Sequence, residues 1–492
     1  MSVRAHHPKY DDYIEKWKRC RDVAEGQDAV HEAGVDYLPK LKDQTDDDYK
    51  AYRNRAVFFN ATWRTLSGLS GMLFRKPPKI ECPAVTATLL DTVTDDGQPV
   101  GIFAREVVEE CLVVGRTGIL VDYPDVSTSE LTQADAALLN LRPTMSVYRA
   151  ENIINWKQAV IANQRVLTMV VVQEEHEEEQ DEFESEIETR YRVLDLVNVK
   201  TEGGGGAMTY RVRLFTFNEQ TKAEVQIGDD LFPTMNGAAM GFIPFYFLSA
   251  TDTEITPDDP PMIDLVDLNL AHYRVTADYE HGCHFTGLPT GYVAGYTKQE
   301  GEKIYLGSQT MLIFPDPNVK VGFLEFSGAG LGSLQQNLER KESQMAILGA
   351  RMLEAQKRAA ESAEAAGIHR AGENSLLADI AQAISLGMTA ALQTFSDWAG
   401  GSGTVTFELN RDFFPAPISA QELTALVQAW QTGAISKETL FTNLQAGQLI
   451  AEGTTFEQEE TRINDQLIMS PGLPADPNAA DPAAATNQPE GA

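Results

Sequence analysis

The residues most suited to metal chemistry in this chain form a short cluster, His281, Cys283 and His284. Imidazole and thiolate groups bind zinc, but structural zinc sites usually take four ligands from two separated pairs. No second pair follows at a recognisable spacing. We therefore expect no metal at this cluster, and the sequence predicts no bound cofactor.

A glycine-rich segment, residues 327–332, precedes a predicted helix and could be compared with a phosphate-binding loop. The N–H groups at a helix N-terminus can bind phosphate. A nucleotide-binding loop also needs a lysine and a hydroxyl residue, and this chain has Ser333 and Leu334 where they would stand. A tight turn is the better interpretation, and ATP hydrolysis by a loop of this type is not expected.

Other catalytic motifs are absent from the sequence. The chain contains neither the G-x-S-x-G of serine hydrolases nor the H-E-x-x-H of zinc proteases. An acidic run, residues 174–188, lacks the alternating ligands and fixed glycine of a calcium loop. Repulsion between its carboxylates favours a solvated hairpin. No residue stands out as catalytic, and we predict that the protein is not an enzyme.

The charge balance limits how the protein can meet nucleic acid. With 72 acidic and 40 basic residues, the formal net charge is -32. Non-specific DNA binding depends on Lys and Arg displacing counterions, so no broad DNA-gripping surface is expected. The four cysteines form no C-x-x-C pair, which is typical of a reducing compartment. The one long apolar stretch, residues 376–395, contains Asp379, and we expect no membrane span.

Hydrophobic periodicity places helices on both sides of a β region, which predicts an α+β fold. Residues 145–250 contain short β-branched and aromatic runs separated by turns, typical of antiparallel strands. Helices are predicted over residues 8–34 and 100–114, the second followed by a buried strand, residues 119–123. Another helix is predicted from about Asp46. Its apolar stripe would consist of Phe59, Trp63, Leu66 and Leu73.

In the later part of the chain, the sequence pattern predicts two helices, a loop, a third helix and a strand, in that order. A helix that opens at Met262 carries an apolar face of Val266, Leu270, Tyr273 and Ala277. The helix after the glycine turn has apolar residues at helical spacing. They are Leu334, Leu338, Met345, Leu348 and Met352.

A segment rich in alanine and charge, residues 357–374, separates that helix from the next. We predict a mobile loop there, although the helix propensity of residues 359–366 leaves a continuous helix open. Residues 375–398 have only Asp379 and Asp397 as charges. Such a helix must be covered on most sides, by this chain or by neighbouring copies. Residues 404–409 then alternate like a strand.

The C-terminal residues return to helices and end in a polar tail. Ser419 and Glu422 form a capping box at the start of one helix. Two more helices are predicted around Leu440 and over residues 455–467. From Ser470 onward proline, alanine and Asp dominate, so this tail is predicted to be disordered.

The order of these elements resembles that of the tailed-bacteriophage portal, or head-to-tail connector, family. In that family a stem helix, a tunnel loop, a long wing helix and a wing strand precede the crown. Residues 433–440 resemble a Gly-x-Ile-Ser-x-Glu-Thr-Leu turn that is frequent between portal crown helices. Three N-terminal phrases are similar, in order, to those of a portal subgroup. They are Tyr-Leu-Pro at residues 37–39, Arg-Ala-x-Phe-x-Asn-x-Thr at 55–62 and Phe-Arg-Lys-Pro-Pro at 74–78.

The resemblance implies a portal-like α+β fold, with a mainly helical wing, stem and crown, an antiparallel β region and a small α/β clip. The implied divisions are a wing at 1–260 with its β-rich part at 145–250, a first stem helix at 261–286, a clip at 287–331, a second stem helix at 332–356, a tunnel loop at 357–374, a long wing helix and strand at 375–412, a crown at 413–468 and a disordered tail at 469–492.

The resemblance also implies a function. Copies of the chain would form a ring, dodecameric in the family, at one vertex of the capsid, and double-stranded DNA would pass through it during packaging and ejection. The implied partners are the terminase large subunit, a neck or tail adaptor, and the major capsid and scaffolding proteins, with no membrane. The protein would lie in the virion, and in the host cytoplasm during assembly. Two alternatives stay open: a nuclease or protease of packaging or maturation, and an acidic scaffold without a DNA role.

Two sets of candidate residues follow from this resemblance. The DNA-channel candidates are Arg340, Lys341, Arg351, Lys357, Arg358, His369 and Arg370. The clip candidates for docking terminase or adaptor are Tyr296, Lys298, Glu300 and Lys303. For the stem-helix cations two interpretations stay open, transient contact with DNA or pairing with nearby carboxylates.

Overall fold

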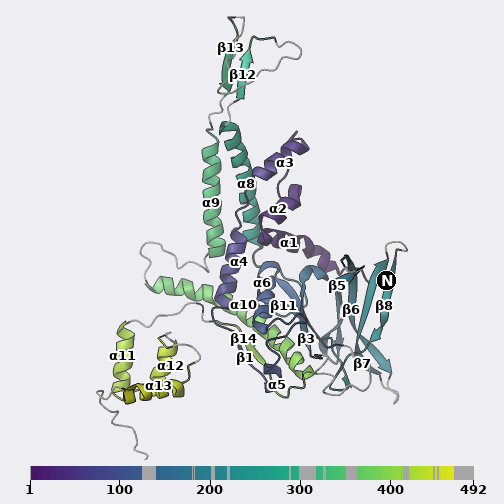
Figure 1. Ribbon diagram of the computed structural model, residues 1–492, viewed down its shortest axis with the longest axis vertical. Helices are drawn as coiled ribbons and strands as arrows, with labels where there is room; N and C mark the ends of the chain where they lie inside the picture. The colour runs from purple at the N-terminus through teal and green to yellow at the C-terminus, as the bar shows by residue number, and fades with distance from the viewer. Residues whose placement is uncertain are drawn as a thin grey trace, which may run out of the picture. The chain divides into compact units, whose positions relative to one another are not determined.

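The computed structural model describes residues 2–124, 140–179, 181, 183–200, 206–218, 222–287, 290–297, 317–324, 328–350, 363–411, 413, 420–446, 449–450 and 454–469. Two compact units divide the chain, Met1–Arg411 and Asp412–Ala492. The first combines helices with antiparallel sheets and the second is helical (Figure 1). The predicted α+β class is therefore confirmed.

Four helices and a short 3-10 turn begin the first unit: α1 (Pro8–Glu25), α2 (Gln27–Ala33), η1 (Gly34–Asp36), α3 (Asp46–Arg55) and α4 (Ala61–Leu73). The helices predicted over residues 8–34 are confirmed, with a break at Gly26, whose φ is 113°. The single helix predicted from Asp46 is wrong, because α3 and α4 are separate. Asn60 starts α4 by accepting a hydrogen bond from the N–H of Trp63 at 2.8 Å. Trp63 is 49% exposed, so the predicted apolar stripe is incomplete.

A three-stranded sheet of order β11-β2-β3 packs against α6 (Val100–Val114) through β2 and β3. Its antiparallel strands are β2 (Arg116–Asp122), β3 (Thr144–Arg149) and β11 (Phe245–Ser249). Gly115 turns α6 into β2 with a φ of 82°, in the left-handed region that favours glycine. Residues 116–121 are buried, which confirms the predicted buried strand. Short elements nearby are α5 (Ala84–Ala87) and η2 (Ala150–Asn152).

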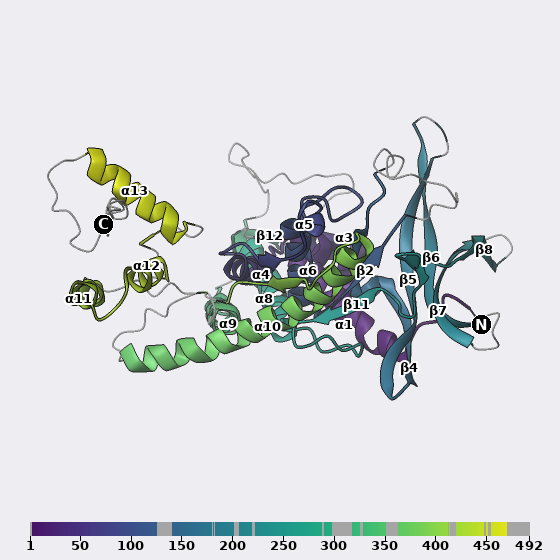
Figure 2. The same ribbon diagram turned by 90° about the horizontal axis from the view of Figure 1, so that it is seen from below.

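A second antiparallel sheet has the order β4-β5-β6-β7-β8. Its strands are β4 (Ile153–Ile161), β5 (Gln164–Glu179), β6 (Ser185–Lys200), β7 (Gly206–Asn218) and β8 (Ala223–Leu231), and a small hairpin of β9 (Thr234–Met235) and β10 (Ala238–Ala239) follows. The antiparallel region predicted over residues 145–250 is confirmed. The acidic run forms the predicted hairpin, since Glu174 pairs in register with Arg190 and Glu179 with Ser185. Figure 2 shows β5 and β6 extending together beyond the other strands.

Two long helices, α8 (Ile263–Gly287) and α9 (Leu331–Ala350), lie side by side (Figure 1). We call them the helix pair. Between them in sequence, β12 (Thr290–Ala294) and β13 (Lys320–Leu324) form an antiparallel hairpin. The predicted apolar face of α8 is confirmed, because Val266, Leu270, Tyr273 and Ala277 are all buried. The glycine-rich segment makes a tight turn, in which the N–H of Leu331 bonds the carbonyl of Gly328 at 2.9 Å.

The helix α10 (Ala363–Trp398) begins well before Ser375, where the sequence predicted its start. Alanine and glutamate are good helix formers, so residues 363–374 follow the continuous-helix alternative rather than the predicted loop. α10 contacts α4, α6 and β11 (Figures 1 and 2). Ile384 and Phe395 are 0% exposed. This chain itself therefore covers these residues, without a neighbouring copy.

A short edge strand, β14 (Thr406–Glu408), pairs antiparallel with β1 (Lys79–Glu81) and also meets α10. Three side chains of α10 accept hydrogen bonds from alternate N–H groups of this segment: Ser385 from Leu409 at 3.0 Å, Thr389 from Phe407 at 3.0 Å and Gln393 from Val405 at 2.8 Å. Four helical residues rise about 6 Å and two strand residues about 6.6 Å, so the two spacings match. The helix thereby provides hydrogen-bond acceptors for the N–H groups along one edge of the strand.

The second unit consists of α11 (Ala420–Gln431), α12 (Lys437–Ala446) and α13 (Phe456–Met469). They confirm the helices predicted in this part of the chain. The proposed cap residue Ser419 and the predicted disordered tail lie outside the described residues. Among the helices that the structure describes, none is long and apolar enough to cross a membrane.

Candidate functional site

The first helix of the pair, α8, is fixed to the N-terminal helices by one buried side chain. Asn269 is 0% exposed, and its Oδ1 accepts hydrogen bonds from the N–H groups of Ala61 at 3.1 Å and Thr62 at 3.2 Å. Its Nδ2 donates to the carbonyl of Phe59 at 2.8 Å. The first N–H groups of a helix have no partner within that helix. Asn269 supplies partners for those of α4, and so locks α4 against α8.

Three further polar contacts hold α8 along its length. Arg19 of α1 forms an ion pair with Asp267 at 3.1 Å, Arg274 donates to the carbonyl of Tyr37 at 2.8 Å, and Tyr52 of α3 donates to Asp278 at 2.6 Å. The spacing of seven and four residues puts Asp267, Arg274 and Asp278 on one side of the helix. Burial, followed by the bond to Asp278, raises the pKa of Tyr52. The N-terminal helices therefore cover one face of α8.

The other helix of the pair, α9, packs on a different part of α8. His272 is buried, and its Nε2 lies 3.3 Å from Oε1 of Glu342. Burial lowers the pKa of His272, against the opposing effect of Glu342. Met345 is 3% exposed, and a Cβ added at Gly282 would lie 2.6 Å from the side chain of Leu331. The two helices thus approach closely at Gly282.

The outer face of α9 carries the two channel candidates whose side chains are described. The guanidinium of Arg340 donates to Oδ1 of Asn337 at 3.2 Å. Neither Arg340 nor Lys341 forms an ion pair with a carboxylate in the described part of the chain. The nearby acid Glu342 is directed to His272 instead. Pairing of these two cations with carboxylates is therefore not observed within the described residues, and contact with DNA stays a prediction.

The remaining candidates cannot be placed by their side chains. Arg351, Lys357 and Arg358 lie outside the described residues, as do Lys298, Glu300 and Lys303. His369 and Arg370 belong to α10, in the part whose side chains are not described. Tyr296 is half-buried just after β12. Of the channel candidates, the structure therefore describes the side chains of Arg340 and Lys341 alone. The docking role of the clip stays a prediction.

Several residues of the N-terminal phrases have structural partners. The hydroxyl of Tyr37 donates to Asp22 at 2.6 Å. Nδ2 of Asn60 donates to the carbonyl of Ala24 at 3.0 Å, and the hydroxyl of Thr62 donates to Asn269 at 3.1 Å. These residue types therefore serve to lock α1, α4 and α8 together, which the sequence alone did not reveal.

A buried ion network was also missed by the sequence analysis. Arg21 of α1 forms ion pairs with Glu110 at 2.8 Å and with Glu151 at 2.6 Å. Although Glu110 is an acidic residue, it is only 9% exposed. Hydrogen bonds to both carboxylates raise the pKa of Arg21 in spite of its burial. The network fixes α1 to α6, and no local pattern in the sequence marks it.

Metal chemistry has no visible support in the described part of the chain, where no three His, Cys, Asp or Glu side chains gather closely enough to hold an ion. His281, one of the cluster considered above, packs edge-on against Tyr52 and Phe285 at 5.3 and 4.7 Å between ring centroids. This histidine therefore has a packing role in the first unit.

Comparison with known proteins gives one family model and a larger set of solved structures, of which three are described below. The family described as "Domain of unknown function (DUF4055)" matches residues 261–399, from just before α8 to just after α10. No curated protein matches the chain.

Three of the matching solved structures align with most of the chain at low similarity. They are "Virion of native gene transfer agent (GTA) particle" (10% identity, 85% of this chain and 98% of that chain, TM-score 0.38), "Neck of native GTA particle computed with C12 symmetry" (12%, 82% and 94%, 0.34) and "Neck of empty GTA particle computed with C6 symmetry" (11%, 82% and 94%, 0.39).

Proposed function

We propose that this protein is a portal subunit, which forms a ring at one capsid vertex and acts as a conduit for double-stranded DNA. The proposal combines the resemblance of its sequence phrases and element order with the geometry of the helix pair. The protein acts without catalysis, as a structural part of the virion that assembles in the host cytoplasm. Its partners are the terminase large subunit, a neck or tail adaptor, and the major capsid and scaffolding proteins.

The observation that carries the proposal is the one-sided packing of the helix pair. The polar contacts at Asp267, Asn269, Arg274 and Asp278 tie α8 to the N-terminal helices. Among the described residues the outer face of α9 has no such polar contacts, and Leu348 on it is 52% exposed. A ring of copies would bury apolar positions of this kind against neighbours, because closed heterologous contacts repeat around the axis. It would leave Arg340 and Lys341 as candidates to face the channel.

The charges fit passage of DNA rather than tight binding. A net charge of -32 per chain repels a phosphate backbone, while a few cations attract it only within a Debye length of about 8 Å at physiological salt. In this proposal Arg340, Lys341 and the segment at 357–374 line the channel. The clip at 287–331 docks the terminase and then the adaptor.

Particle mass and shape test the proposal. We expect the purified full chain to form rings visible by negative-stain electron microscopy, with a mass close to that of a dodecamer by light scattering. A monomer or dimer at micromolar concentration would contradict the proposal that the chain forms a ring. Metal-dependent cleavage of duplex DNA by that species would favour the nuclease alternative instead.

A further inference from the structure

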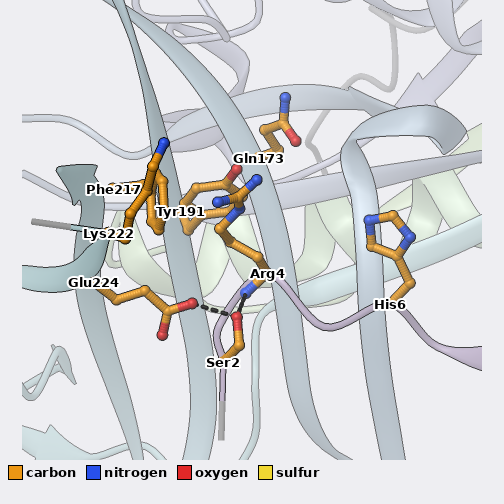
Figure 3. A pocket seen from close by; sticks show the side chains of 8 residues that line it. All are labelled: Ser2, Arg4, His6, Gln173, Tyr191, Phe217, Lys222 and Glu224. Atoms are coloured by element: carbon orange, nitrogen blue, oxygen red, sulfur yellow. Dashed lines mark hydrogen bonds between the residues drawn. The ribbon is translucent and has the colours of Figure 1, made fainter. Parts of the chain in front are cut away.

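An N-terminal segment, residues 2–7, runs across the five-stranded sheet, and we call it the strap. At one end the hydroxyl of Ser2 donates to Glu224 of β8, and the N–H of Val3 bonds the same carboxylate at 3.0 Å. The guanidinium of Arg4 then lies 4.1 Å from the ring centroid of Phe217 on β7. Figure 3 shows Ser2, Arg4 and His6 on one side of a cavity whose other side the sheet supplies.

The strap covers part of the sheet rather than filling a core. An open surface pocket between the strap and the sheet measures about 680 Å³ and is lined on the sheet side by Gln173, Tyr191, Phe217, Lys222 and Glu224. At the other end of the strap, Nδ2 of Asn155 donates to the carbonyl of Ala5 at 2.6 Å. The N–H of His7 bonds the carbonyl of Ile154 at 2.9 Å. A few polar contacts therefore hold the strap down.

His7 joins the strap to α1, and its contacts require a neutral ring. Nδ1 of His7 accepts a hydrogen bond from the N–H of Lys9 at 3.1 Å and so caps α1. The ring also stacks on Trp156, with 4.1 Å between centroids and 17° between planes. An imidazole nitrogen accepts a hydrogen bond only while it carries no proton. Protonation would therefore remove the cap and place a cation at a helix N-terminus, where the dipole disfavours it.

The charged groups around His7 are cationic. Lys9 lies beside it on α1, and Lys157 of β4 lines the same surface cavity as His6 and His7. From β2, the guanidinium of Arg116 lies 4.1 Å from the centroid of the same Trp156 ring.

The acids near this site have other partners. Asp11 pairs with the neighbouring His6 at 2.9 Å. Burial lowers the pKa of Arg116, and Asp258 partly opposes this; Asp258 also accepts a hydrogen bond from the hydroxyl of Thr251. Burial, then Arg116 and then Lys9, lower the pKa of His7 below 6.5. Neutral pH therefore keeps His7 in its capping form.

We propose that His7 is a pH-sensitive latch, whose protonation frees the strap and uncovers the sheet face at Gln173, Tyr191 and Phe217. The direction of the pH effect on stability follows from the lowered pKa of His7. Because the folded chain binds this proton less readily than the unfolded chain, the contribution of His7 to stability is full above pH 6.5 and is lost as the pH falls below it. This inference does not depend on the proposed ring.

Hydrogen exchange of the full chain between pH 7.5 and pH 5.0 tests the latch. After correction for the intrinsic pH dependence of exchange, amides at residues 3–12 should exchange at least about fivefold faster at pH 5.0, the factor expected for loss of a helix cap. His7→Asn keeps a capping oxygen but cannot titrate in this range, so its strap should stay protected throughout.

His6→Asn is the matched control, because it removes the adjacent histidine and its pair with Asp11 but leaves the cap. It should respond to pH as the unchanged chain does. Equal pH profiles for the unchanged chain and His7→Asn would overturn the proposal, and so would a response that disappears in His6→Asn.

Discussion

At the scale of single residues, buried polar side chains determine how the elements of the first unit are joined. Asn269 supplies the hydrogen bonds that the start of α4 lacks, and Arg21 neutralises two carboxylates between α1 and α6. Arg116 is held differently. Its guanidinium lies 4.1 Å from the Trp156 ring centroid and 4.4 Å from that of Phe247, with no hydrogen-bond partner among the described residues. Burial lowers the pKa of Arg116 to about 9.

Replacement of Asn269 by leucine should destabilise the chain by about 2–4 kcal/mol, because buried N–H and carbonyl groups at the start of α4 would lose their partner. Chemical denaturation of the purified chain, followed by circular dichroism, measures this change. Asn337→Ala is the control, since Asn337 makes one exposed contact with Arg340 on the surface of α9. This variant should change the free energy of unfolding by no more than about 0.5 kcal/mol. Equal costs for the two variants would contradict the role of Asn269.

At the scale of elements, α10 shows how a nearly uncharged helix is accommodated. Its polar residues at 385, 389 and 393 bond the strand segment around β14. Its apolar residues pack against α4, α6 and β11. Among the large apolar side chains of α10 that the structure describes, Leu386 is the exception, at 59% exposed, and marks a face that this unit leaves open.

Substitutions at two neighbouring positions on α10 test folding and assembly separately. Ile384→Asp should prevent folding, because an unpaired carboxylate at a 0% exposed position costs several kcal/mol. Leu386→Asp should fold normally and give fewer rings. Circular dichroism reports folding and light scattering reports mass. If the Ile384→Asp chain folds, position 384 is not buried as described. If Leu386→Asp still forms intact rings, the exposed face at Leu386 is not part of the proposed interface between subunits.

At the scale of the whole molecule, charge decides how a ring of these chains could treat DNA. The net charge of -32 opposes adhesion, and the cations of α9 are too few to overcome it at physiological salt. A conduit benefits from this balance, since DNA that is held tightly cannot slide. The same balance argues against a protein that stores or compacts DNA.

Duplex DNA should bind the isolated ring weakly at 50 mM salt and detach by 150 mM, as measured by fluorescence anisotropy, because each phosphate contact releases counterions. Changing Arg340 and Lys341 together to alanine should weaken the low-salt binding further. The control removes the same charge from the exposed Lys42 and Lys50, and should have a smaller effect. Salt-resistant binding, or equal losses in the two double variants, would contradict a channel role for α9.

The sequence by itself determined the features that depend on local periodicity. It identified the antiparallel β region, the acidic hairpin and the buried face of α8, including Val266 and Tyr273. These follow from alternation along a strand and from the recurrence of apolar residues around a helix, which operate over a few neighbours. Turn chemistry is equally local, as the tight turn at Gly328 shows.

Only the tertiary structure decided which polar residues would be buried and what would cover α10. Asn269 and Thr62 are 207 positions apart, and Arg21 and Glu110 are 89 apart. No local pattern relates such residues, because their pairing depends on how distant helices pack. The division of α3 from α4 has the same cause, since Asn269 of a remote helix stabilises the new start at Ala61. Burial of Ile384 was likewise settled by elements that α10 meets only in the folded chain.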